Sequence, residues 1–506
     1  MKKFLALFLV LALMVPMFTF ASADDLQEIK VMVWDRGDAP AGGSVEVNKI
    51  TEWINEQVAP LGLKVTFVST ARSGSDGVLQ TWMAGGKAPD VVFTYDQNLF
   101  LQFATQGGLV DMKAAIDNLG PDSNIQKYVG SVMNMGYLNG EQLALLSIRG
   151  VANPRHTAYI RQDWLDELGL PLPTTKQELI DTLYAFKAAK PDCIPWAMSG
   201  RTDTEKGYLN FIGSYATLAD EKDAYVYSEA YLTMHEGTLE GIKVLNKLYN
   251  DGIIMNEFAT DTTEDLYKQA VSSGKAGFIL DDNTRIFDYL DALNCENGEQ
   301  VRTTFVPVTA FTQEDGSIRN PFEYAYGMYV MMPWSSEGKQ EAVVKYLNWL
   351  CDPEVAENIA YAPEHTRKES GVPNSFTGDE LSAMGYKKTL DDVNILNKHF
   401  AFMETREGLV DNLIGVNKFE TPEWFSNLRD AMEVGFFRYP TMPSAPDVEA
   451  EKGATVIDAM LTYVYRLISC TPDQFDALEA ELRANMVNAG LQEILDARAA
   501  YWDANK

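Results

Sequence analysis

Short apolar segments alternate with amphipathic ones through the first part of the chain. The strands predicted from mostly apolar, β-rich runs are 29–34, 63–69 and 91–94. Apolar residues at helical spacing predict helices between these strands, at 44–58 with Ser44 as N-cap and at 77–84 before a glycine pair. This β-α-β-α-β order predicts a parallel sheet covered by helices, whose ligands bind beyond the carboxyl ends of the strands.

The middle of the chain continues this alternation, and the pattern is mostly helical from residue 400 onward. Further predicted strands are 143–149, 158–161, 277–280 and 322–332. Further predicted helices are 163–168, 176–190, 230–249, 265–273 and 338–350. Thr174 or Thr175, with Gln177 or Glu178 three residues later, is a candidate capping box for the helix at 176–190. The turn-rich segment 150–155 is the predicted first passage between two lobes.

The first 23 residues have the pattern of a secretory signal peptide. Two lysines precede an apolar run at 4–20, and Ala21-Ser22-Ala23 supplies a small-x-small cleavage site. An uncleaved membrane anchor is the alternative, because the apolar run is about as long as the shortest spanning helices. No cysteine lies near the cleavage site, so a lipobox anchor is not expected. The sequence predicts export to the periplasm or the extracellular space, where most ATP- and NAD(P)H-dependent enzyme classes are not expected.

Composition and charge indicate a large, acidic, folded protein. A chain of 506 residues is too long for one ordinary hydrophobic core and fits two or three domains. Its net charge of −30 repels phosphate backbones, so nucleic acid is not an expected partner. The four cysteines are far apart in sequence, which leaves up to two disulfides open and provides no zinc motif. They are Cys193, Cys295, Cys351 and Cys470.

Known catalytic and metal-binding motifs are incomplete in this chain. SGKA (273–276) lacks the earlier glycine and the hydroxyl residue of a phosphate-binding loop. HEGTL (235–239) has leucine at the second histidine position of a zinc-protease helix. The acidic runs 220–223 and 261–265 lack the pattern of a calcium loop and are expected to be solvated loops. No cofactor is therefore expected, and a structural Ca²⁺ has no sequence support.

The segment QTWMAGGKAPDVVFTYDQNLFLQFATQGGLVDM (80–112) carries a more specific pattern. A helix ends in a small-glycine pair, Pro-Asp leads into an apolar strand, and an aromatic helix precedes Gly-x-Leu-x-Asp. The matching residues are Ala84, Gly85, Pro89, Asp90, Val91, Val92, Gly107, Leu109 and Asp111. This pattern resembles the signature of family 1 extracellular solute-binding proteins, the capture subunits of ABC importers. The stretches 159–186, 248–277 and 342–354 resemble further parts of the family, most of all its large oligosaccharide-binding branch of lipoprotein and alginate-binding types.

The resemblance implies an α/β fold with two lobes, of the type II periplasmic-binding-protein kind, with hinge strands and an extended, mostly helical C-terminal part. Chain crossings near 150, 280 and 325 would give an N-lobe of 24–150 plus 281–325. The C-lobe would then comprise 151–280 plus 326–506. The implied function is capture of an extracellular solute, foremost an oligosaccharide, and its delivery to an ABC permease when the lobes close. A monomer without catalytic residues is expected.

Ligand-binding candidates are the aromatic, amide and charged residues near the predicted strand ends and crossings. Aromatic rings cover the C–H faces of sugars, and Asp, Asn and Arg side chains bind pairs of hydroxyl groups. The candidates are Trp34, Asp35, Arg36, Tyr95, Asp96, Arg149, Arg155, Trp196, Arg201, Asp282, Asn283, Arg285, Tyr324 and Tyr326. Core packing is the alternative for each aromatic residue, and a solvated loop is the alternative for each charged one. Trp34 is the foremost candidate, and Tyr324 and Tyr326 would share one face of a regular strand.

One turn departs from the family pattern and keeps other ligands open. After 274–277 the family often has a Gly-x-Trp-like turn whose ring stacks on sugar, whereas this chain has DDNT (281–284). That departure leaves room for a more polar, cationic or peptide-like ligand, while the candidate arginines favour hydroxyl-rich or carboxylated glycans. The alternative function is a secreted glycan-active enzyme, a hydrolase or lyase, whose cleft would also contain aromatic residues and carboxylates.

Overall fold

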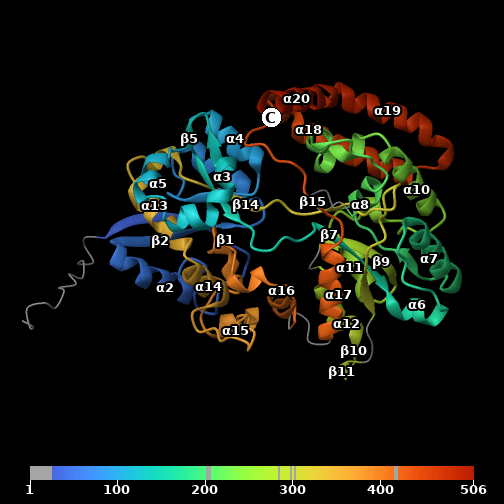
Figure 1. Cartoon of the computed structure of the whole chain (residues 1–506), viewed down its shortest axis with the longest axis horizontal. Coiled ribbons are helices and arrows are strands. Elements are labelled where there is room, and N and C mark those ends of the chain that lie inside the picture. Colours follow the sequence, from blue (N-terminus) through green and yellow to red (C-terminus); the bar gives the residue numbers. More distant parts are fainter. Residues whose placement is uncertain (1–25, 201–206, 283–284, 297–298, 301–303, 415–419) are drawn as a thin grey trace, which may run out of the picture.

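The computed structural model describes residues 26–200, 207–282, 285–296, 299–300, 304–414 and 420–506. The predicted signal peptide and the candidate residues Arg201 and Asn283 lie outside this part of the chain. The described residues form two lobes, each with its own hydrophobic core and its own strands (Figure 1). Within the described ranges, no helix is both long enough and apolar enough to cross a membrane.

The first lobe is built on the predicted parallel strands. β1 (Gln27–Asp35) pairs in parallel with β2 (Leu63–Ala71) along its whole length, and an isolated parallel bridge joins β1 to the residue before β3 (Val92–Thr94). β14 (Tyr326–Met331) lies between β3 and β6 (Ala144–Ile148) and is antiparallel to both. Strands from distant parts of the sequence therefore share one core.

Helices cover these strands, with one cap that differs from the prediction. α2 (Lys49–Val58) begins at Asn48, whose side chain accepts a hydrogen bond from the amide of Ile50 and forms a capping box with Thr51. Ser44 is therefore not the N-cap; its hydroxyl accepts hydrogen bonds within the preceding turn. The remaining longer helices of this lobe are α3 (Ser75–Ala84), α4 (Gln97–Thr105), α5 (Lys113–Leu119), α13 (Gln340–Leu350) and α14 (Pro353–Tyr361).

The second lobe has a four-stranded sheet in the order β12-β7-β9-β8. Its strands are β12 (Phe305–Val308), β7 (His156–Arg161), β9 (Ala276–Asp282) and β8 (Ile194–Trp196). β8 and β9 are parallel, and β7 is antiparallel to both β9 and β12. α7 (Lys176–Ala189) packs beside this sheet and begins at the predicted capping box, formed by Thr175 and Glu178.

The helix predicted over 230–249 is two separate elements. η5 (Glu229–Met234) is a 3-10 helix, and α10 (Thr238–Asn250) begins after Gly237. Gly237 has a φ of 95°, and a Cβ there would lie 2.2 Å from the carbonyl oxygen of Tyr215. Both elements bury apolar residues in the same core, so the hydrophobic pattern continues across a break that only the backbone of Gly237 permits.

The two cores divide the second half of the chain differently from the prediction. β14 and α13 belong to the first core, so the assignment of 326–506 to the C-lobe is wrong as far as residue 396. β12 and the described residues that precede it from 281 onward belong to the second core, so the described part of 281–311 is not in the N-lobe. The reason is strand pairing: β14 completes a sheet with β3 and β6, and no local pattern encodes such a long-range pairing.

The described chain passes between the lobes at 149–155, at 312–325 and again after residue 397. The first of these crossings lies where the sequence predicts it. Among the residues that the structure describes, no crossing occurs near 280. The crossing that ends near 325 leads back into the first lobe, opposite to the predicted direction. Bridges join Pro154 to Phe322 and Ile148 to Asn397, so the three crossings lie against one another.

The C-terminal part is helical, as predicted, and packs on the second lobe. Its helices are α17 (Pro422–Glu433), α18 (Asp447–Ser469), α19 (Phe475–Asn488) and α20 (Leu491–Asn505). α18 to α20 lie along the upper edge of the second lobe in Figure 1. α18 also contacts α4 of the first lobe, and the Gln97 side-chain amide donates to the Met442 carbonyl at 3.2 Å. The C-terminal part therefore adds a contact between the lobes besides the crossings.

Gly150 provides a test of how closely the crossings approach. A Cβ at Gly150 would lie 1.9 Å from the backbone oxygen of Lys398 and 2.4 Å from the sulfur of Met403, so Gly150→Ala forces two crossings apart. We expect this variant to lose about 1–3 kcal/mol of unfolding free energy, measured by urea denaturation. Gly77→Ala, where a Cβ has nothing within 4 Å, is the matched control and should be neutral or slightly stabilising. Equal unfolding midpoints for the two variants would contradict this arrangement.

Candidate functional site

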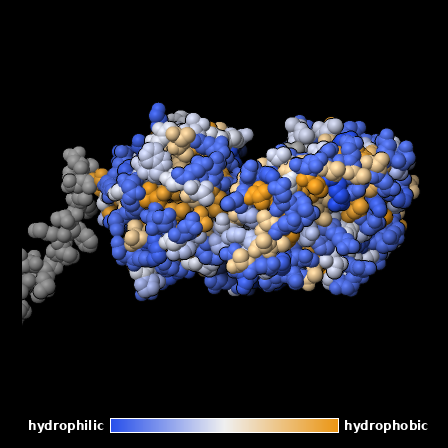
Figure 2. Space-filling model, turned by 90° about the horizontal axis from the view of Figure 1, so that it is seen from above, coloured by the Kyte–Doolittle hydropathy of each residue, from blue (hydrophilic) through white to orange (hydrophobic). Residues whose placement is uncertain are grey.

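The candidate site lies between the lobes, where strands of both sheets end. β1 and β2 of the first lobe run toward the crossings (Figure 1), and β3 is antiparallel to β14, which follows the second crossing. In the second lobe, the end of β9 pairs with the start of β7, which follows the first crossing. In the space-filling view from above, the surface is indented where the lobes meet (Figure 2). Both sheets therefore present their strand ends to one region, which we call the inter-lobe site.

The first-lobe side of this site is centred on Trp34. Its side chain is only 2% exposed, because Tyr95 stacks on it at 5.8 Å and Phe93 meets it edge-on at 4.8 Å. The guanidinium carbon of Arg72, which directly follows β2, lies 4.1 Å from the Trp34 ring centroid, and that of Arg36 lies 5.6 Å away. Tyr95 is 45% exposed. Trp34 therefore lies beneath other side chains, and Tyr95 and Arg72 are the groups that a ligand would contact.

Arg36 is held from behind by a buried charge cluster. Its Nε donates to both carboxylate oxygens of Asp392, at 2.9 and 3.1 Å. The fully buried ammonium of Lys387 lies 2.8 Å from Asp392 and 3.1 Å from Asp38. Two cations and two carboxylates balance one another here, which a buried cluster requires. The segment that carries Lys387 and Asp392, which the sequence did not associate with the site, therefore fixes the position of Arg36.

Tyr324 and Tyr326 lie side by side, as their spacing predicts. Their rings stack at 5.6 Å with an interplanar angle of 10°. Tyr326 is buried, whereas Tyr324 is half-buried where the two lobes meet. Burial, and then the nearby carboxylate of Glu229 in the second lobe, raise the pKa of Tyr324. Glu229 is exposed and has a φ of 51°, a strained backbone conformation of the kind found at functional sites.

Glu323 joins two candidate arginines at the crossings. Arg149 donates to its carboxylate at 2.7 Å, and Arg155 donates to it at 3.2 Å. Arg155 also lies 3.6 Å from Asp282 at the end of β9. The structure thus brings together Arg149, Arg155 and Asp282 through the carboxylate of Glu323, which no local sequence pattern singles out.

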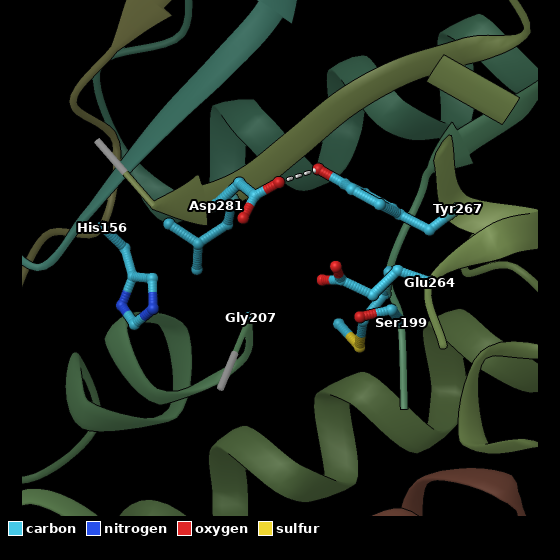
Figure 3. A pocket seen from close by; sticks show the side chains of 8 residues that line it. His156, Ser199, Gly207, Glu264, Tyr267 and Asp281 are labelled. Carbon is cyan, nitrogen blue, oxygen red and sulfur yellow. Dashed lines mark hydrogen bonds between the residues drawn. The ribbon is translucent and has the colours of Figure 1, made fainter. Parts of the chain in front are cut away.

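The second-lobe side contains a small recess at the strand ends (Figure 3). It is lined by His156, Met198, Ser199, Gly207, Glu264, Tyr267, Leu280 and Asp281. The Tyr267 hydroxyl donates to the Asp281 carboxylate at 2.6 Å, and His156 lies on the opposite side of the recess from Glu264 (Figure 3). Burial raises the pKa of Asp281 to about 6. The recess adds polar groups to the inter-lobe site without an exposed aromatic ring, in keeping with the DDNT departure in the sequence.

The remaining described candidates are engaged by neighbouring groups of the fold. Trp196 is 1% exposed and packs edge-on against two phenylalanines, so the alternative of core packing holds for it. Asp96 caps α4, and Asp35 accepts a hydrogen bond from a backbone amide two residues later. Arg285 pairs with the buried carboxylate of Glu264 at 2.7 Å, beside the recess.

Arg72, Glu229 and Glu323 are the main residues that sequence reasoning missed. Arg72 follows the second predicted strand, so the rule that selected Trp34 and Tyr95 at strand ends applies to it as well. Glu229 and Glu323 carry no comparable signal, because their positions depend on how the crossings pack.

The described residues form neither a metal site nor a disulfide. No group of three or more His, Cys, Asp or Glu side chains among them is arranged to hold a metal ion. The carboxylates of Asp220 and Asp261 instead accept backbone amides at the starts of α9 (Glu221–Val226) and α11 (Asp265–Ser272). The described free thiols are Cys193, Cys351 and Cys470.

Comparison with known proteins identifies the class. The model of the family described as bacterial extracellular solute-binding protein matches residues 50–357, more than half of the chain. The chain therefore belongs to this family, as the motif at 80–112 indicates.

Individual relatives are distant in sequence. Lipoprotein LipO of Bacillus subtilis is 21% identical over 330 residues, which cover 62% of this chain and 61% of LipO, under two thirds of its length. The polygalacturonan/rhamnogalacturonan-binding protein YtcQ of Bacillus subtilis is 20% identical over 353 residues, 67% of this chain and 68% of YtcQ. Among solved structures, the HMO-binding ABC-transporter-associated solute-binding protein of Bifidobacterium longum infantis superposes with a TM-score of 0.66. It is 18% identical, and the match covers 94% of this chain and 99% of that one. This likeness shows that the two-lobed α/β fold is shared.

Asp281 should make stability depend on pH. Its folded-state pKa of about 6 lies above its ordinary value of 3.8, so its protonated form stabilises the fold. That contribution is complete below about pH 4 and is lost as the pH rises through 6. Asp281→Asn keeps an acceptor for Tyr267 but carries no charge. Relative to the unmodified protein, this variant should therefore gain up to about 3 kcal/mol of unfolding free energy between pH 4 and pH 7.

Urea denaturation at several pH values measures this change. Asp379→Asn is the control, because a hydrogen bond from Lys388 lowers the pKa of the exposed Asp379. Its charged form stabilises the fold, so this substitution should change the pH dependence of the unfolding free energy in the opposite direction. A difference between Asp281→Asn and the unmodified protein that stays constant from pH 4 to pH 7 would show that Asp281 is not protonated in this way.

Proposed function

We propose that this chain is the solute-capture subunit of an ABC importer and that its ligand is an oligosaccharide. The observation that carries the ligand class is the exposed ring of Tyr95 beside Arg72 at the strand ends. The half-buried Tyr324, two residues before β14, adds a second ring where the lobes meet. Aromatic rings cover the apolar faces of sugars, and guanidinium and carboxylate groups bind their hydroxyls. The names of YtcQ and of the Bifidobacterium protein, which refer to glycan binding, support the same class.

Lobe closure is the proposed signal for transport. A ligand between the lobes contacts both sides only when they approach, so binding shifts the equilibrium toward the closed form. The crossings at 149–155, at 312–325 and after residue 397 lie against one another beside Glu323, and together they form the proposed hinge. The closed form would then dock on the permease. A monomer suffices for this role.

Export and the lack of catalysis complete the proposal. The signal peptide predicted at 1–23 would deliver the protein outside the cytoplasm without a lipobox anchor. The carboxylates of Glu323 and Asp392 are engaged by arginine, whereas a glycosidase needs a carboxylate pair that acts on the substrate. No observation favours the alternative of a hydrolase or lyase.

A thermal-shift screen tests the proposed function. We expect neutral or acidic oligosaccharides to raise the melting temperature, and peptides and polyamines to leave it unchanged; a ligand at 100 times its Kd stabilises by about 2.7 kcal/mol. Tyr95→Ala should weaken oligosaccharide binding by up to about tenfold. Tyr137→Ala, which removes a ring of similar exposure (40%) on β4 (Tyr137–Leu138), is the control and should bind normally.

Chromatography of the ligand after prolonged incubation separates capture from catalysis. Recovery of the intact oligosaccharide is expected. Stabilisation by peptides or polyamines alone would contradict the proposed ligand class, and cleavage products would contradict the proposal of a non-catalytic subunit.

A further inference from the structure

Arg72 differs from the other arginines of the inter-lobe site in having no carboxylate partner. Arg36 pairs with Asp392, and Arg149 and Arg155 both pair with Glu323. Among the residues that the structure describes, no acidic group lies within 4 Å of the Arg72 guanidinium, and its only hydrogen bond is made by its backbone amide. In a chain with 72 acidic and 42 basic side chains, an unpaired arginine in this position is unexpected.

The surroundings of Arg72 hold the guanidinium in place while leaving its donors open. One side lies over the Trp34 ring at 4.1 Å, and the Tyr95 ring centroid is 5.9 Å away. Stacking on an aromatic ring covers a flat face of the guanidinium but not the N–H groups along its edge. The side chain is half-buried, so those donors are partly shielded from water. This arrangement is pre-organised to receive two hydrogen bonds from a planar anion.

Tyr95 indicates the kind of molecule to which that anion belongs. Its ring is 45% exposed and adjoins Arg72, whereas Trp34 is 2% exposed and only supports the two from beneath. A ligand that uses both exposed groups therefore presents an apolar face to Tyr95 and a carboxylate to Arg72. A sugar residue with a carboxylate on its ring has both features.

We propose that Arg72, supported by Trp34, receives the carboxylate of a uronate residue, so that the ligand is an acidic oligosaccharide. This inference rests on the proposed function, because it specifies the ligand of the same site. Arg72 contacts the ligand, and Trp34 is a positioning residue that acts through Arg72. Selection for acidic sugars is then a property of Arg72 and the Trp34 ring beneath it. It does not come from the net charge of the protein, which is strongly negative.

Calorimetry with matched probes tests this inference on the full chain. The acidic probes are trigalacturonate, trimannuronate and a glucuronate-containing tetrasaccharide, and each is compared with its carboxyl-reduced, neutral counterpart. We expect at least one acidic probe to bind about tenfold or more tightly than its neutral counterpart, with affinity falling as salt rises. The difference within each pair depends only on the carboxylate.

Substitutions of Arg72 test whether this residue causes the preference for acidic over neutral probes. Arg72→Gln should lose about tenfold or more in affinity for the acidic probe and change affinity for its neutral counterpart less than twofold. Arg72→Lys keeps the charge but not the planar fork, so an intermediate loss is expected, and this variant serves if the glutamine variant does not fold. Arg406→Gln, an exposed arginine of α16 (Arg406–Leu413) that pairs with Asp430, makes the same charge change and should leave both affinities unchanged.

The two proposals fail in distinguishable ways. Neutral oligosaccharides that bind as tightly as the acidic ones, or equal effects of Arg72→Gln on both members of a pair, would overturn the uronate inference and leave the proposed function standing. Failure of every acidic and neutral glycan to bind would overturn the proposed function itself.

Discussion

The carboxylate of Glu323 is the interaction on which the inter-lobe site depends. It accepts hydrogen bonds from Arg149 and Arg155, which lie at opposite ends of the first crossing, and Arg155 extends the network to Asp282 at the end of a second-lobe strand. Two guanidinium groups this close would repel each other without it. Because its charges balance, the network can hold the strand ends of both lobes in one region without itself selecting the charge of a ligand.

Ligand selection can then rest on the groups that this network leaves unpaired. On the first-lobe side these are the Tyr95 ring and the Arg72 guanidinium, both supported by Trp34. On the second-lobe side the recess supplies Asp281 and Glu264, which are themselves engaged by Tyr267 and Arg285. The two sides thus differ in character, with the aromatic surface on one lobe and a satisfied polar surface on the other.

Local sequence patterns predicted the elements well and their long-range partners poorly. The strands at 29–34 and 63–69 and the capping box of Thr175 and Glu178 are encoded within short segments, and the structure confirms them. The predicted lobe of β14 is wrong because its pairing with β3 and β6 joins residues far apart in the chain. The hydrophobic period does not reveal the break at Gly237, because it continues through it.

The same distinction applies to the site. Trp34 ends a predicted strand and Tyr95 directly follows one, so the strand-end rule selects both, and the same rule applies to Arg72 after β2. Trp196 also ends a strand, but its ring turns into the second core, which a strand-end rule alone cannot foresee. Glu323 could not be predicted, since its role arises only where two crossings meet.

Small-angle X-ray scattering of the full chain, with and without a saturating oligosaccharide, tests the central claim of a two-lobed trap most directly. The account predicts that the radius of gyration decreases when the ligand binds, because the lobes close about the crossings. An unchanged radius of gyration in a sample whose binding sites are shown by calorimetry to be filled would contradict it.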